Sequence, residues 1–274
     1  MNALATELEG TQTRTSARTY LQMVRAELLK LTRRRSIMAT AAFLSIGVVV
    51  LYYGVLEIEH LASPGRYGPA GGLGRFDHTL ALLSVYFGAL AAMLIGTEAG
   101  TTDTASGVFR DLVVTGRSRL ALFAVRVPAA LFITLTLALT ALGLAIVATY
   151  VFAGGLPTPS ASFVADGVLW VCGAQLVMCV LALGVGGLTG SRSASLTILI
   201  AWQVIGGRVL ASANVFGDGR DAIPNVALGA LKPGQSLSDN FGLSMGAGVA
   251  VAVLAGWVIV WLALGARKTL VRDA

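Results

Sequence analysis

Six long apolar segments without any charged residue most constrain what this chain can fold into. A helix needs about 20 predominantly apolar residues to cross the roughly 30 Å of hydrocarbon in a bilayer. The segments are Ile37–Leu56, Thr79–Ile95, Val127–Phe152, Val168–Leu188, Ser193–Gly207 and Leu243–Leu264. Because the second and fifth are short, we expect their helices to extend to Thr97 and Val209. The pattern predicts an all-α integral membrane protein with six transmembrane helices.

The overall composition agrees with a membrane protein and excludes a soluble enzyme. Of the 274 residues, 55% are hydrophobic and only 12% are charged, whereas an average soluble domain carries about 25% charged residues. Too few polar side chains remain to cover a soluble protein of this length. Cys172 and Cys179 lie in one apolar segment, about 10 Å apart along a helix. That distance is too long for a disulfide, so we expect two free thiols.

The basic residues predict how the chain is oriented. Fifteen of the 20 Lys and Arg residues lie before the first span, after the second, after the fourth and in the C-terminal tail. Since cytoplasmic segments carry the excess of Lys and Arg, we expect both termini in the cytoplasm. The chain is then a multi-pass protein of a cytoplasmic (inner or plasma) membrane. The first apolar segment is longer than the core of a signal peptide, so we expect it to be retained as the first span.

The segment before the first span has the pattern of an amphipathic helix. Four apolar residues recur on one face, namely Leu21, Val24, Leu28 and Leu31. We expect an N-terminal elbow helix at the membrane interface, with its basic face toward anionic lipid headgroups. The alternative is a plain helical extension of the first span. The expected divisions are a disordered cytoplasmic tail at 1–18, the elbow helix at 19–36, the six-span domain at 37–266 and a cytoplasmic tail at 267–274.

The loop at 97–126 joins the second and third spans, and it is too long for a tight turn and too polar for the membrane. Phe109 and Leu112 stand three residues apart beside Arg110 and Asp111, which is typical of a short helix with an apolar face. An exposed apolar face beside opposite charges favours a protein partner. The alternative is a loop that lies on the membrane.

Three loops are expected on the other side of the membrane, at 57–78, 153–167 and 208–242. The first is rich in Gly, and we expect it to lack regular structure. Within the third, Ile223–Leu231 contains Pro224 and is followed by Pro233. This segment could form a short re-entrant or interfacial helix, and the sequence pattern does not decide between helix and loop.

Several kinds of chemistry are missing from the sequence. No GxxxxGK[ST] or HExxH motif is present, which argues against ATP binding through a P-loop and against metalloprotease activity. Ion-coupled transport normally places ionisable groups near the middle of the membrane, and the six apolar segments contain none. We therefore predict no enzyme activity, no cofactor and no metal site. The net charge of +6 lies in segments between the spans rather than in a basic groove, so we expect no nucleic-acid partner.

The chain resembles the membrane-spanning permease subunit of ATP-binding-cassette transporters, in the type-two exporter family. That family has six spans, both ends inside, a basic elbow helix and a coupling helix between the second and third spans. The residues at matching positions of the family's loop are Asp103, Gly107, Phe109, Arg110, Leu112, Val113, Thr115, Gly116, Ser118, Arg119 and Arg126. Val108, Gly116 and Arg126 depart from the family's usual Thr, Pro and Lys.

The resemblance implies a transport component without catalytic residues of its own. Two permease copies, identical or related, would pair with two cytoplasmic ATPase subunits, which would hydrolyse the ATP. The residues that would couple the permease to the ATPase are Asp103, Gly107, Phe109, Arg110, Asp111, Leu112 and Arg119. The cargo for efflux would be hydrophobic or amphipathic: a drug, peptide, lipid or glycan. A motor-independent facilitator or channel, and a non-transporting membrane scaffold, are the alternatives.

The only amide side chains within the apolar segments belong to Gln175 and Gln203, the latter beside Trp202. These three residues are candidates for the substrate path. The alternative role of the two glutamines is hydrogen bonding between helices, typically about 0.6 kcal/mol per bond.

Overall fold

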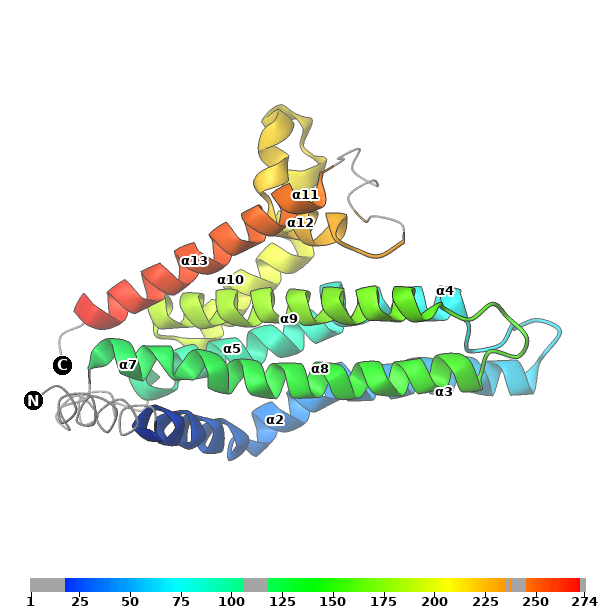
Figure 1. Cartoon of the computed structure of the whole chain (residues 1–274), viewed down its shortest axis with the longest axis horizontal. Helices are drawn as coiled ribbons and strands as arrows, with labels where there is room; N and C mark the ends of the chain where they lie inside the picture. Colours follow the sequence, from blue (N-terminus) through cyan, green and yellow to red (C-terminus); the bar gives the residue numbers. More distant parts are fainter. Residues whose placement is uncertain (1–17, 106–117, 235–236, 238–244, 272–274) are drawn as a thin grey trace, which may run out of the picture.

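The computed structural model describes residues 18–105, 118–234, 237 and 245–271, and its regular elements within these ranges are all helical (Figure 1). Six helices are long and apolar enough to cross a membrane: Arg35–Ala62, Leu73–Thr102, Arg119–Val151, Ala161–Thr189, Arg192–Ser212 and Ala247–Val271. They confirm the predicted six spans and fit a multi-pass membrane protein. We refer to them as spans 1 to 6.

Four of the spans are built from more than one helical element. Span 1 contains α2 (Arg35–Ala42), the π-helical η1 (Phe43–Gly47) and α3 (Val48–Ala62). Span 2 contains α4 (Leu73–Ala81), the π-helical η2 (Leu82–Tyr86) and α5 (Phe87–Ala105). Span 3 consists of α7 (Arg119–Ala124) and α8 (Arg126–Val151). Span 5 contains α10 (Arg192–Ala201), the π-helical η3 (Trp202–Gly206) and α11 (Gly207–Ser212). Spans 4 and 6 are single helices, α9 (Ala161–Thr189) and α13 (Ala247–Val271).

Serine side chains begin several of these helices. Ser160 accepts a hydrogen bond from the main-chain N–H of Phe163 at the start of α9, and Ser118 does the same for α7. A hydroxyl at this position satisfies an N–H group that has no partner within the helix. At the other end of α9, Gly190 adopts a left-handed conformation with φ of 67°, which suits glycine at a helix C-terminus. Spans 4 and 5 are therefore joined by a tight turn.

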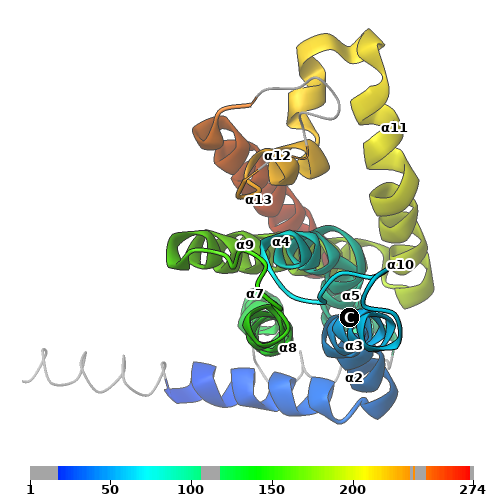
Figure 2. The ribbon, with the colours of Figure 1, turned by 90° about the vertical axis from the view of Figure 1, so that its right-hand side faces the viewer.

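Span 2 lies among α3, α8, α9 and α10, as Figure 2 shows in a view along the spans. Its contact with α9 depends on glycine. A methyl group at Gly96 would overlap the carbonyl oxygen of Cys179, and one at Gly100 would crowd the carbonyl of Leu183. Small residues allow two helix backbones to approach closely in a membrane. Spans 2 and 4 thus form the closely packed centre of the molecule.

Large apolar side chains are exposed along the outside of the spans. Examples are Phe43 and Val50 in span 1, Phe132 in span 3, Ile198 in span 5 and Ile259 in span 6, each more than half exposed. This arrangement fits a surface that faces lipid rather than water. Cys172 and Cys179 are both free thiols, as predicted.

Residues 18–32 form a helix ahead of α2, and it lies crosswise to the spans (Figure 2). Of the four residues predicted for an apolar face, Val24, Leu28 and Leu31 pack on the main hydrophobic core. The fourth, Leu21, is 61% exposed. The predicted apolar face therefore packs on the protein itself over most of its length.

The helices extend further beyond the apolar segments than the sequence indicated. The expectation that 57–78 lacks regular structure is wrong at both ends, because α3 continues to Ala62 and α4 begins at Leu73. Main-chain hydrogen bonds can continue a helix past the hydrocarbon, since polar residues such as Glu are good helix formers. The segment Ile223–Leu231, which the sequence left undecided, contains the short helix α12 (Pro224–Ala230), with its Pro in the first turn. It follows a 3-10 segment, η4 (Asn214–Ala222).

Candidate functional site

Most of the predicted coupling residues lie outside the described part of the chain: Gly107, Phe109, Arg110, Asp111 and Leu112. The structure does place the backbone on either side of them. Asp103 belongs to the last turn of α5, and Arg119 is the first residue of α7. The guanidinium of Arg119 donates a hydrogen bond to the carbonyl oxygen of Leu270 (3.0 Å). This bond connects the start of span 3 to the end of span 6.

A buried carboxylate, Glu98, lies at the same end of the molecule. It is 4% exposed, and it forms ion pairs with Arg34 (3.4 Å) and Arg192 (3.3 Å). The hydroxyl of Thr102 also donates to the Glu98 carboxylate (3.2 Å). Burial of a charged group is unfavourable unless it is paired and hydrogen-bonded, and these partners provide the pairing. We call Glu98, Arg34 and Arg192 the Glu98 junction.

The Glu98 junction connects three separate segments of the chain. Arg34 comes just before α2, Glu98 lies in α5, and Arg192 begins α10. The α9–α10 turn beside it is reinforced by the Thr189 and Ser195 hydroxyls, which lie 2.5 Å apart. Since α5 leads directly into residues 106–117, the junction lies next to the predicted coupling segment. The sequence pattern did not indicate a role for Glu98, because the apolar segment of span 2 ends at Ile95 and a carboxylate beyond it is typical of a loop.

The two glutamines both bind the π-helical part of span 2. Gln175 donates its amide N–H to the carbonyl oxygen of Leu83 (2.6 Å) and Gln203 to that of Val85 (2.8 Å). Both side chains are buried, 2% and 6% exposed. Both acceptors lie in the π-helical turn η2, where the regular α-helical hydrogen-bond pattern is interrupted. The contacts are those expected of hydrogen bonding between helices.

Gln203 is buried, whereas the neighbouring Trp202 is partly exposed and contacts span 6. Its ring centroid lies 6.4 Å from that of Trp257, and Trp257 in turn stacks on Trp261 with the same centroid separation. The indole N–H of Trp257 donates to the carbonyl oxygen of Ala222 (2.8 Å). Trp202 therefore contributes to an aromatic contact between spans 5 and 6.

An apolar groove of about 690 Å³ lies between α9, α12 and α13. Its walls include Leu169, Val177, Leu254 and Val258. Trp170 donates its indole N–H to the carbonyl oxygen of Leu228 (2.8 Å) and so fixes α12 over one end. The groove has the size and apolar character of a site for a hydrophobic small molecule.

The described residues contain no group of three or more His, Cys, Asp or Glu side chains placed to hold a metal ion. Compared with models of known protein families and with curated proteins, the chain matches none. The six apolar helices fit the class of multi-pass α-helical membrane proteins.

Proposed function

We propose that this chain is the membrane-spanning permease subunit of an ATP-driven exporter. It would pair with a second permease copy and couple to a cytoplasmic ATP-binding-cassette ATPase through the loop at 97–126. The observation that best supports the proposal is the Glu98 junction. Glu98 lies in α5, the helix that leads into the predicted coupling segment. Its buried carboxylate pairs with Arg34 and Arg192, which belong to two other segments of the bundle.

The proposed orientation places the Glu98 junction in the cytoplasm. The ends of spans 2, 4 and 6 and the starts of spans 1, 3 and 5 all lie at this end. The tails and connections at this end, together with the adjoining ends of the spans, hold 15 of the 20 Lys and Arg residues, as expected for the cytoplasmic side. The elbow helix at 18–32 would then lie at the cytoplasmic interface, with the N-terminus on the same side.

The packing supports a route by which the ATPase would move the spans. A displacement of residues 106–117 would act on α5, which is held to Arg34 and Arg192 through Glu98. Further along span 2, the hydrogen bonds from Gln175 and Gln203 connect η2 to spans 4 and 5. Close packing makes such elements move as units rather than deform continuously. The cargo would be hydrophobic or amphipathic, and the apolar groove is a site of matching chemistry.

The test is co-purification of the chain with its proposed ATP-binding-cassette ATPase partner. Removal of the apolar anchor by Phe109→Ala should weaken docking by a few tens of fold, because burying a Phe side chain is worth about 1.5–3 kcal/mol. Arg110→Glu is the control, since exposed ion pairs contribute only about 0–1 kcal/mol. Complex yield is measured for both variants beside the wild type. Full yield with Phe109→Ala would count against this loop as the coupling element and favour a motor-independent facilitator.

A further inference from the structure

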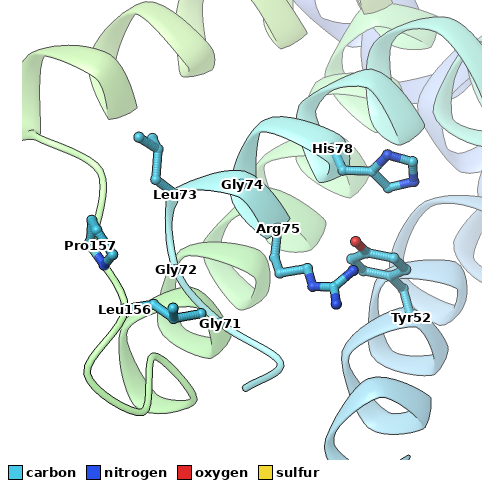
Figure 3. A pocket seen from close by; sticks show the side chains of 9 residues that line it. All are labelled: Tyr52, Gly71, Gly72, Leu73, Gly74, Arg75, His78, Leu156 and Pro157. Atoms are coloured by element: carbon cyan, nitrogen blue, oxygen red, sulfur yellow. The ribbon is translucent and has the colours of Figure 1, made fainter. Parts of the chain in front are cut away.

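At the end of the bundle opposite the Glu98 junction lies a cavity of about 630 Å³ (Figure 3). We call it the Arg75 pocket, and its lining residues are Tyr52, Gly71, Gly72, Leu73, Gly74, Arg75, His78, Leu156 and Pro157. The side chains of Arg75 and His78 both extend from α4 toward Tyr52 on α3 (Figure 3). The ring of His78 stacks on that of Tyr52, with a centroid separation of 5.3 Å.

The main chain of the Arg75 pocket is held in place by hydrogen bonds. The N–H groups of Gly71, Gly72 and Leu73 donate to carbonyl oxygens at the end of α8 and in the following loop, over 2.8–3.0 Å. A methyl group at Gly71 would lie 2.6 Å from the carbonyl carbon of Phe152, and Gly72 has a φ of 89°. Both positions therefore require glycine. The pocket is a fixed feature of the fold rather than the gap left by a loose loop.

The electrostatics of the Arg75 pocket are positive. Gly72 precedes α4 and offers no side chain to cap it, and no acidic residue lies in the first turn. The N-terminal end of a helix carries a partial positive charge and attracts anions. Arg75 adds a full charge in this turn, and no described carboxylate forms an ion pair with its guanidinium. The neighbouring Asp77 is instead paired with Lys232.

We propose that the Arg75 pocket binds the phosphate group of a membrane lipid. A guanidinium matches phosphate with paired, charge-assisted hydrogen bonds, and the Tyr52 hydroxyl and His78 ring are further polar groups on the wall. Leu73, Leu156 and Pro157 supply an apolar wall for the part of the lipid next to the phosphate. The proposal requires only that the chain lies in a membrane and does not depend on the proposed transport function.

The length of span 2 favours a lipid over a soluble phosphate as the source of this group. Its helix has 30 residues, which corresponds to about 45 Å at 1.5 Å per residue. The hydrocarbon layer is only about 30 Å thick. The first turn of α4 therefore reaches the level of the lipid headgroups, where phosphate is concentrated.

The experiment measures lipid binding to the full chain in an uncharged detergent. The probe is a short-chain phosphatidylglycerol with a fluorescent tail, and binding is followed by fluorescence anisotropy. Arg75→Gln should weaken binding by at least about tenfold, as expected for loss of a charge-assisted hydrogen bond. The matched control is Arg66→Gln, because Arg66 is at the same end but lies over the Tyr67 ring, 5.5 Å from its centroid. It should change binding by less than about twofold.

Two further arms complete the test. Glycerol 3-phosphate, which has the phosphate without the tails, should compete only at far higher concentration than the unlabelled lipid, and equal potency would overturn the lipid as the source. Arg75→Lys retains the charge without the paired geometry, so it should bind more weakly than the wild type and more tightly than Arg75→Gln. If Arg75→Gln folds poorly, the binding of Arg75→Lys still tests the role of Arg75. Wild-type binding in both Arg75 variants, or equal losses in Arg75→Gln and Arg66→Gln, would overturn the site.

Discussion

Span 2 carries a buried ion pair near each of its ends. At one end the buried group is an acid, Glu98, between two arginines that are half exposed. At the other end the buried group is a base, Lys232, whose side chain is 3% exposed and pairs with the Asp77 carboxylate, which is 39% exposed. If its partner is removed, the more exposed group of each pair can be solvated by water, whereas the buried group cannot. The two ends should therefore respond differently to removal of their acid.

The segments that each ion pair connects also differ. The partners of Glu98 begin spans 1 and 5, and α5 continues toward the predicted coupling segment. The partner of Asp77 follows α12, in the connection between spans 5 and 6. The Glu98 end joins moving parts in the proposed mechanism, and the Asp77 end holds a short helix over the apolar groove. We expect loss of Glu98 to affect coupling most and loss of Asp77 to affect stability most.

The largest expected effect concerns the placement of the two ends on opposite sides of the membrane. In a Cys172→Ala/Cys179→Ala background, Gly65→Cys should react with an impermeant thiol reagent in intact cells, and Ser193→Cys should not. Both positions are exposed, and no atom lies within 4 Å of a Cβ added at Gly65. Reaction of Ser193→Cys in intact cells would refute the proposed orientation, and reaction of both variants would place both ends on one side.

The next largest effect concerns stability. Asp77→Asn removes the Asp77 carboxylate from the buried ammonium of Lys232, which should lower the free energy of unfolding by about 3 kcal/mol. Unfolding by a denaturing detergent provides the measurement. The double variant Asp77→Asn/Lys232→Met removes the buried charge as well and should recover most of the loss. If the double variant is no more stable than Asp77→Asn, the buried ammonium is not the cause.

A smaller effect distinguishes the two glutamines. Gln175→Leu leaves the carbonyl of Leu83 without its hydrogen bond, a loss of about 1–3 kcal/mol for a buried group. Gln203→Leu should cost about 1 kcal/mol less, because the Gln203 carbonyl oxygen is itself buried without a hydrogen-bond partner among the described residues. The same unfolding assay measures both. A change in transported cargo without loss of stability in Gln203→Leu would instead support a place on the substrate path.

The local sequence pattern predicted the features that depend on hydrophobicity and spacing. The six spans and the two free thiols follow from that pattern. It did not predict the Glu98 junction, because a carboxylate just past an apolar segment has the pattern of a loop residue. Its burial depends on Arg34 and Arg192, which only the three-dimensional packing brings together.

Two other features had no readable signal in the sequence. The π-helical segment η2 has the composition of any apolar span, so neither its π-helical turn nor the partners of Gln175 and Gln203 could be anticipated. The Arg75 pocket lies partly in a segment that was expected to be irregular. Its positive charge depends on the start of α4 at Leu73, several residues before the apolar segment begins.

In the proposed mechanism, the Glu98 junction transmits movement between the ATPase and the spans. The measurement is ATP hydrolysis by the purified complex in lipid nanodiscs, compared with the ATPase alone. Glu98→Gln is the test variant, and Glu57→Gln, the same substitution at the opposite end, is its control. Glu98→Gln should cost only about 1 kcal/mol of stability because its partners are half exposed. We expect Glu98→Gln to form the complex but no longer to change the rate of ATP hydrolysis, and we expect Glu57→Gln to behave like the wild type. If Glu98→Gln changes the rate of hydrolysis as much as the wild type does, the Glu98 junction does not transmit the movement.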